Sequence, residues 1–383
     1  MLVIGTLLTD RVSFLSRFNI PPPIVGGLLF AMLSLILQQA AGLRLSLDVS
    51  AKSPMLLVFF ASVGLTADIS LLAKGGRRLL RFLACLFPFL FLQNALGVLM
   101  ANLLGLHPVL GLVAGSITLV GGHGTGAAYA ERFAEEHDLL GVMGLTMTSA
   151  TIGLMLGGVI GGPVASRLVR RLVPAPERPS AEGGVVVGPT SVPVTTYSVM
   201  LSLGAALAAV VGGGVVAGLL EGSAVTVPSF LWCLIMGLII RNAGPLLGLR
   251  LPDSATDLIG SSCLSLFLVW TMMTLDLASV ASLAGPLLVI LALQTVLVAA
   301  WASAVVFRFS GRDYEAAVTA AAFCGFAMGA TATAIANMQA VSRRYGPAPE
   351  SFVMVPIVGA FFVDLMNLAV LTLFLVPGVV VAR

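Results

Sequence analysis

Two Gly/Thr-rich segments interrupt long apolar stretches of this 383-residue chain. The first reads GGHGTGAA from Gly121 to Ala128, and the second reads GFAMGATATA from Gly325 to Ala334. Glycine permits tight turns and close ligand approach, and free backbone amides at such turns can bind a carboxylate. In a simpler interpretation, glycine and threonine only let helices pack closely. Because hydroxyl groups, a histidine and an asparagine accompany the glycines, we expect a binding site here.

Side chains in and beside the two segments add hydrogen-bonding groups to this backbone. His123 is the only histidine within an apolar span, and it could either bond a substrate or hold the turn. Asn337 follows the second segment, and we expect it to reach a cavity. The predicted substrate-binding residues are Ser116, Gly121, Gly122, His123, Gly124, Thr125, Gly126, Gly329, Thr331, Thr333 and Asn337.

One carboxylate lies deep in the last apolar stretch. Asp364 occurs in FFVDLMNL, three residues before Asn367 and therefore on the same helical face. A carboxylate at membrane depth is a functional hypothesis by default, and hard oxygen ligands suit a small cation. Asp364 could bind sodium or a substrate ammonium group. The predicted sodium ligands are Asp364, Asn367, Asn94 and Thr66.

The composition indicates a polytopic membrane protein. Hydrophobic residues make up 58% of the chain and charged residues only 10%, whereas globular domains carry about 25% charged residues. The basic residues therefore have to be interpreted by position, and they do not indicate nucleic-acid binding. The four cysteines are scattered, with no CxxC pair and no histidine cluster, so we expect sodium as the only metal, no transition metal and no organic cofactor.

The apolar stretches predict a series of membrane helices. A bilayer core about 30 Å thick needs about 20 apolar residues per helix. We expect spans near 20–41, 54–72, 79–105, 140–166, 197–220, 227–249, 257–279, 284–307 and 351–378. A Pro/Glu/Ser/Gly-rich linker at 174–196 divides the chain into 1–173 and 197–383.

The two divisions match as an internal repeat. A shift of about 208 residues places Gly121 and Thr125 on Gly329 and Thr333, and paired interruptions of this kind are typical of transporters built from inverted repeats. If the Gly/Thr segments form re-entrant hairpins at 109–130 and 315–340, sixteen of the 20 Lys and Arg residues lie on one side of the membrane, together with the linker. The positive-inside rule makes that side cytoplasmic.

The predicted fold is thus an all-α polytopic membrane protein with two inverted five-helix repeats, each containing a re-entrant helical hairpin. One helix of the first repeat is incomplete, because only Met1 to Thr9 is apolar before Asp10 and Arg11. Nine helical residues span about 14 Å, which is half of the bilayer core. We therefore expect the first helix to be truncated in this chain.

Three segments resemble the bacterial sodium/glutamate symporter family: AGSITLVGGHGTGAAYA at 114–130, CGFAMGATATAIANMQAV at 324–341 and VPIVGAFFVDLMNL at 355–368. The likeness extends to IPPPIVGGLL at 20–29 and FFASVGLTADIS at 59–70, and so runs over essentially the whole chain. The chain departs from the family pattern in its short first helix and in Ala332, where the family more often has proline.

The resemblance implies a bacterial inner-membrane protein, a homodimer, that imports L-glutamate with sodium by alternating access of the elevator type. It also implies that Gly121 to Gly126, Gly329 to Thr333 and Asn337 form the hairpin motifs, and that Asp364 and Asn367 bind the cation or the amine. The alternatives are a sodium- or proton-coupled carrier of aspartate or another dicarboxylate, and, in a different class, a solute or ion channel. We expect no enzyme, because GxSxG, HExxH and GxxxxGK are absent.

Overall fold

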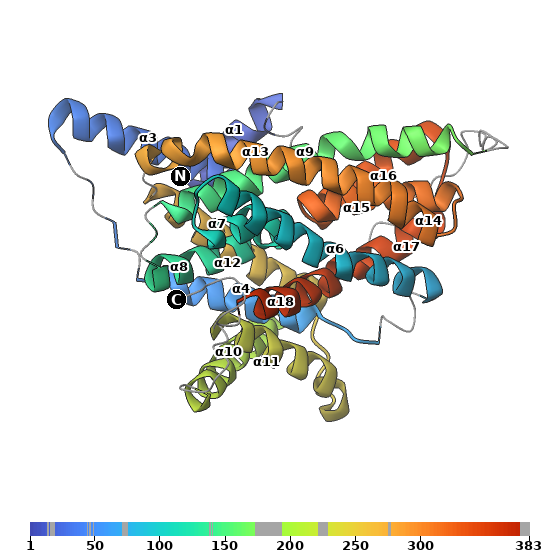
Figure 1. The fold of residues 1–383 in the computed structure, drawn as a ribbon. Coiled ribbons are helices and arrows are strands. Elements are labelled where there is room, and N and C mark those ends of the chain that lie inside the picture. Colours follow the sequence, from blue (N-terminus) through green and yellow to red (C-terminus); the bar gives the residue numbers. More distant parts are fainter. Residues whose placement is uncertain are drawn as a thin grey trace. The chain divides into compact units, whose positions relative to one another are not determined.

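The computed structural model describes residues 1–13, 15, 20–43, 45, 47–48, 50–70, 76–137, 139, 141–172, 194–220, 229–274 and 277–375. Every regular element among these residues is a helix (Figure 1). The chain forms two compact units. Unit 1 contains 1–16, 21–70 and 186–277, and unit 2 contains 17–20, 71–185 and 278–383. Each half of the sequence therefore contributes to both units.

Unit 1 is a helical bundle organised around one central helix. Its elements are α1 (Leu2–Arg11), α3 (Pro22–Ala41), α4 (Lys52–Thr66), α10 (Thr196–Leu219), α11 (Ser229–Ala243), the 3-10 helix η2 (Gly244–Leu247) and α12 (Asp253–Met273). Helix α4 packs against α10, α11 and α12. Glycines bring the backbones together, because a Cβ atom at Gly64 or Gly237 would collide with the carbonyl of Leu234 or Ala61.

The end of α4 is fixed by one side chain of α11. Asn242 Nδ2 donates to the carbonyls of Ala67 and Leu238, both at 2.8 Å, and Asn242 Oδ1 accepts from the amide of Ile69 at 3.0 Å. These bonds satisfy backbone groups that a longer helix would have paired internally. The expected span at 54–72 is for this reason a 15-residue helix that ends at Thr66.

Unit 2 contains both Gly/Thr segments. Its elements are α6 (Gly76–Leu103), α7 (Pro108–Leu112), η1 (Val113–Ile117), α8 (Gly122–His137), α9 (Val142–Val169), α13 (Leu277–Trp301), η3 (Ala302–Val306), α14 (Phe307–Phe309), α15 (Tyr314–Met328), α16 (Thr331–Tyr345), α17 (Pro349–Ile357), η4 (Val358–Phe362) and α18 (Val363–Phe374). The segments η1, η3 and η4 are π-helical. Such π segments occur frequently at functional sites.

Both Gly/Thr segments form a turn between two helical arms. Hairpin one, residues 108–137, turns at Val120 and Gly121, and hairpin two, residues 314–345, turns at Gly329 and Ala330. Both are longer than the expected 109–130 and 315–340. Their second arms, α8 and α16, pack against α9, as does the first arm α15. The predicted breaks are confirmed, whereas their re-entrance into a membrane stays a prediction.

Seven helices in the described part of the chain are long and apolar enough to cross a membrane. They correspond to seven of the nine expected spans. The other two are the shorter α4 and the last span, which is divided into α17, η4 and α18. The order of elements is the same in both sequence halves, as a repeat requires, and the inverted orientation stays a prediction. Most of the expected linker, residues 174–193, lies outside the described residues.

Replacing Asn242 by alanine should destabilise unit 1. The change leaves the carbonyl of buried Ala67 without this partner, which costs about 1–3 kcal/mol of unfolding free energy, and the exposed amide of Ile69 adds little because water can replace Asn242 there. Thermal unfolding of the purified protein in detergent measures the effect. Asn102→Ala, at an exposed position of α6, is the matched control. Equal midpoints for the two variants would contradict the role assigned to Asn242.

Candidate functional site

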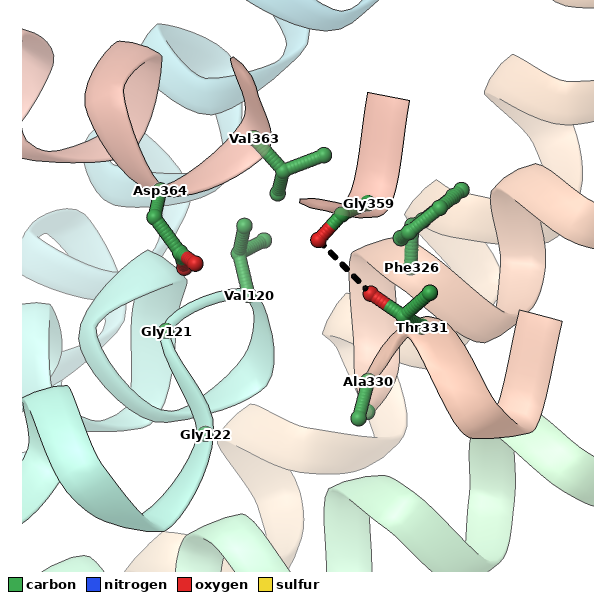
Figure 2. A pocket seen from close by; sticks show the side chains of 10 residues that line it. Val120, Gly121, Gly122, Phe326, Ala330, Thr331, Gly359, Val363 and Asp364 are labelled. Carbon is green, nitrogen blue, oxygen red and sulfur yellow. Dashed lines mark hydrogen bonds between the residues drawn. The ribbon is translucent and has the colours of Figure 1, made fainter. Parts of the chain in front are cut away.

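The two hairpin turns and the start of α18 enclose one cavity of about 140 Å³ in unit 2 (Figure 2). An engineered apolar cavity of about 150 Å³ in another protein binds benzene, so this volume suits a small solute. Both hairpins contribute backbone, and η4 and α18 contribute one wall. The lining residues are Val120, Gly121, Gly122, Phe326, Gly329, Ala330, Thr331, Gly359, Val363 and Asp364.

The turn of hairpin one exposes backbone rather than side chains. Gly122 has φ +63, a left-handed conformation that favours glycine. A Cβ atom on Gly121 would lie 2.6 Å from Thr125 Cβ and 2.7 Å from the carbonyl of Ile117. Helix α8 begins at this turn, and the first amides of a helix have no acceptor within the helix. Of the residues that carry these first amides, Gly122 lines the cavity, so its amide is the one available to a ligand there.

The turn of hairpin two likewise leads into a helix whose first amides have no side-chain cap. Helix α16 begins at Thr331, and its N-cap residue Ala330 provides no side-chain cap. The Thr331 hydroxyl instead donates to the carbonyl of Gly359 at 3.1 Å, across to the π-helical segment η4 (Figure 2). A Cβ atom on Gly359 would collide with the Thr331 side chain. The first amides of α16 therefore have no side-chain cap, and Thr331 brings the first of them to the cavity.

The positive ends of two helices thus meet at one cavity. Each helix N-terminus carries a partial charge of about +0.5, and its free amides form an anion-binding site. Among the described lining residues there is no lysine or arginine. A carboxylate bound here would be held by backbone amides of α8 and α16.

Asp364 brings negative charge to the same cavity. Its carboxylate points toward the Gly121–Gly122 turn (Figure 2). Within the described part of the chain, this carboxylate accepts no hydrogen bond and forms no ion pair. Because an uncompensated carboxylate in apolar surroundings is costly, a cation or an ammonium group is its expected partner. The cavity therefore combines groups for an anion with a group for a cation.

Five of the predicted site residues line this cavity: Gly121, Gly122, Gly329, Thr331 and Asp364. Three others lie behind the turn of hairpin one. The Ser116 amide donates to Asn94 Oδ1 at 2.9 Å, and Asn367 Nδ2 donates to the Ser116 carbonyl at 3.0 Å. All three are fully buried. Asn94 and Asn367 therefore hold the first arm of hairpin one at its break.

The other predicted residues of hairpin one contact α9 or their own turn. His123 Nε2 lies 3.1 Å from Thr151 Oγ1 of α9, so the imidazole links the turn to that helix. Thr125 packs on Gly121, and a Cβ atom on Gly126 would approach Thr146 to 2.8 Å. Gly124 is buried in the first turn of α8. None of these four residues lines the cavity.

Hairpin two is tied to α9 by an amide. Asn337 Nδ2 donates to the carbonyls of Gly157 at 2.9 Å and Ala321 at 3.2 Å, and so joins both arms of the hairpin to α9. Thr333 is buried, and its hydroxyl has no partner among the described residues. Thr66, a predicted sodium ligand, belongs to unit 1, where its hydroxyl donates to the Val63 carbonyl at 2.9 Å.

Sequence reasoning missed several residues of the cavity. Val120, Phe326 and Val363 are ordinary apolar residues, and nothing in their type sets them apart from others in a membrane helix. Gly359 offered a weak signal, because it lies five residues before Asp364 in an otherwise bulky stretch. Its contribution depends on the π-helical geometry of η4, which the sequence pattern did not predict.

The described residues form only helices, several of them long enough to span a membrane, and their cavity is built from two helix breaks and one carboxylate; these are the features of a multi-pass membrane transporter. The chain belongs to the sodium/glutamate symporter family, whose profile matches residues 1–347. The expected family is thereby confirmed, and with it a transporter rather than an enzyme.

Individual relatives agree over nearly the full length. The sodium/glutamate symporter of Escherichia coli (strain K12) is 43% identical over 381 residues, covering 98% of this chain and 94% of that protein. The sodium/glutamate symporter of Haemophilus influenzae is 41% identical over 386 residues, covering 97% and 93%. A solved sodium proton antiporter from Methanocaldococcus jannaschii is 16% identical, with a TM-score of 0.41 over 98% of this chain and 95% of its own.

Gly122→Ala should lower transport by the reconstituted protein more than Gly76→Ala. Both glycines have left-handed backbones, with φ +63 and φ +61, so alanine costs about 1 kcal/mol at either position. Only Gly122 lines the cavity, whereas Gly76 has open space around it. Transport rates in proteoliposomes, compared at equal amounts of folded protein, measure the difference. Similar rates for the two variants would remove Gly122 from the site.

Proposed function

We propose that this chain imports L-glutamate together with sodium across the inner membrane of a bacterium, by alternating access. The observation that carries the proposal is the cavity in which the N-termini of α8 and α16 meet the carboxylate of Asp364. The relatives named sodium/glutamate symporter support the choice of substrate and ion.

The charges at the cavity fit a zwitterionic dicarboxylate. Glutamate has two carboxylates and one ammonium group, and the cavity offers two helix N-termini and one carboxylate. The two N-termini supply a total of about +1, whereas glutamate and Asp364 together carry two net negative charges. A bound sodium ion would balance the remaining charge. The electrostatics of the filled site therefore call for one monovalent cation, and the named relatives favour sodium for it.

The sodium ligands proposed from the sequence are Asp364, Asn367, Asn94 and Thr66. Asp364 supports this assignment best, since its carboxylate lines the cavity without another described partner. It could ligate sodium directly or pair with the ammonium group of the substrate. Either role places the negative charge of α18 opposite a positive ligand.

The composition of unit 2 supports an elevator-type movement. Unit 2 contains the whole cavity, with both hairpin turns and Asp364. A movement of this unit as one body would carry the substrate without taking the site apart. We further propose that the chain works as a homodimer and that the linker at 174–196 is cytoplasmic, as the distribution of basic residues favours.

Purified protein reconstituted into liposomes should accumulate labelled glutamate only when sodium is in excess outside. The expected reason is the charge imbalance that sodium corrects in the filled cavity. Uptake is measured with external sodium replaced by choline as the control. Accumulation that ignores the sodium gradient would contradict sodium coupling, and conductance without accumulation would indicate a channel. Stronger competition by aspartate or another dicarboxylate than by glutamate would reassign the substrate.

Asp364→Asn should reduce sodium-driven uptake at least about tenfold, because it removes the only negative charge among the described lining residues while keeping the shape of the side chain. The dependence of uptake on sodium concentration measures the effect. Asp10→Asn, at an exposed position of unit 1, is the control and should behave as wild type. A normal sodium response in Asp364→Asn would exclude Asp364 from the site.

A further inference from the structure

Behind the turn of hairpin one, unit 2 contains a group of polar side chains that are fully buried and incompletely bonded. We call these residues the buried polar cluster: Gln93 and Asn94 of α6, Ser116 of η1, Gln294 of α13 and Asn367 of α18. Among the described residues, no partner is found for Gln93 Oε1, Asn94 Nδ2, Ser116 Oγ, Gln294 Oε1 and Asn367 Oδ1. None of these atoms lines the substrate cavity.

Hydrogen bonds to the backbone fix the position of each side chain. Asn94 and Asn367 bond the amide and the carbonyl of Ser116, so three members meet at one residue. Gln294 Nε2 donates to the Gln93 carbonyl at 2.8 Å, and Gln93 Nε2 donates to the Ala327 carbonyl at 2.8 Å. Each amide side chain thus uses one of its polar ends and leaves the other one free.

The break in the first arm of hairpin one creates this arrangement. Gly115 has φ −103 and ψ −140, which is not helical, so the Ser116 amide bonds Asn94 instead of a preceding carbonyl. A Cβ atom on Gly115 would lie 2.7 Å from Asn94 Oδ1. Glycine is needed here because the amide of Asn94 occupies that space.

Leaving these atoms unpaired would lower the free energy of unfolding. An unsatisfied buried polar group costs about 1–3 kcal/mol, and folded proteins contain few of them. Four of the five unpaired atoms are oxygens, the ligand type that hard cations prefer. We infer that Ser116 Oγ and Asn367 Oδ1, with the neighbouring cluster, bind a sodium ion at a site separate from the substrate cavity. This inference rests on the proposed sodium-coupled transport.

The same residues connect this site to the substrate cavity. The Ser116 carbonyl accepts from the amides of Val120 at 3.2 Å and Gly121 at 3.0 Å, as well as from Asn367. Val120 and Gly121 line the cavity. A cation held by Ser116 and Asn367 therefore fixes the turn that receives the substrate. Binding of the cation and of the substrate becomes cooperative, because the first ligand to bind already orders the turn and the second loses less conformational entropy.

We assign the charge compensation of this site to Asp364, which is on the same helix as Asn367. The cluster itself is neutral, so a sodium ion there needs a nearby anion in apolar surroundings. Asp364 lies three residues before Asn367 on the same helix. At the positions that the expected repeat pairs with Asn94 and Ser116, the chain has Ala302 and Cys324, which lack the amide and the hydroxyl group.

Ser116→Ala tests the site in the absence of substrate. Sodium should raise the thermal unfolding midpoint of the wild-type protein in detergent, with choline chloride keeping the ionic strength constant. In Ser116→Ala the sodium concentration for half of this effect should rise about tenfold, because one ligand is lost. Ser310→Ala removes another buried hydroxyl without a described partner in unit 2, and it should respond to sodium as the wild type does.

Ser116→Cys gives a second variant that the fold accepts at the paired position, Cys324, and it replaces the oxygen by a soft sulfur ligand. It should weaken the sodium response as Ser116→Ala does. A wild-type sodium response in both variants, with unchanged or higher stability, would overturn the inference and indicate that the cluster only binds water. If wild-type uptake itself ignores sodium, the proposed function fails instead.

Discussion

The structure of unit 2 depends on one constraint: backbone groups at two helix breaks need partners where water does not supply them. Each partner is identifiable. Asn94 and Asn367 bond the backbone of Ser116 in hairpin one, Asn337 bonds carbonyls across hairpin two, and Thr331 bonds the carbonyl of Gly359. What these bonds leave free are the first amides of α8 and α16, of which those of Gly122 and Thr331 belong to residues that line the cavity. The site thus consists of the backbone groups that the fold does not satisfy itself.

This arrangement explains why the cavity has no basic side chain among its described residues. A lysine or arginine would bind a carboxylate strongly and would also require a permanent counter-charge when the site is empty. Two helix termini instead provide partial charges that need no desolvation of a full cation. The full charge at the cavity is the carboxylate of Asp364, so an ion or an ammonium group has to accompany the anion.

The two hairpins are supported differently, although both end in an uncapped helix. Hairpin one is held near its turn by the buried polar cluster. Hairpin two is also held at its base, where Arg78 of α6 pairs with Asp313 at 2.9 Å and with Glu350, and where Glu315 accepts from the Ser351 amide at 2.9 Å. The side chains of these ion pairs are partly exposed, so each pair contributes little by itself.

The sequence by itself determined the class of protein and the two helix breaks, and it singled out Asp364, which lines the cavity, because composition, glycine content and a carboxylate in apolar sequence have consequences that hold in any fold. It did not determine which polar side chains face the ligand. Ser116, Thr125, Thr333 and Asn337 were predicted at the site, yet all four are buried away from the cavity, whereas Gly359 and Val120 line it. The direction of a side chain depends on how its helix is rotated, and that rotation is set by packing against other helices: α6 and α9 for hairpin one, and α9 for hairpin two. Only the tertiary structure could decide it.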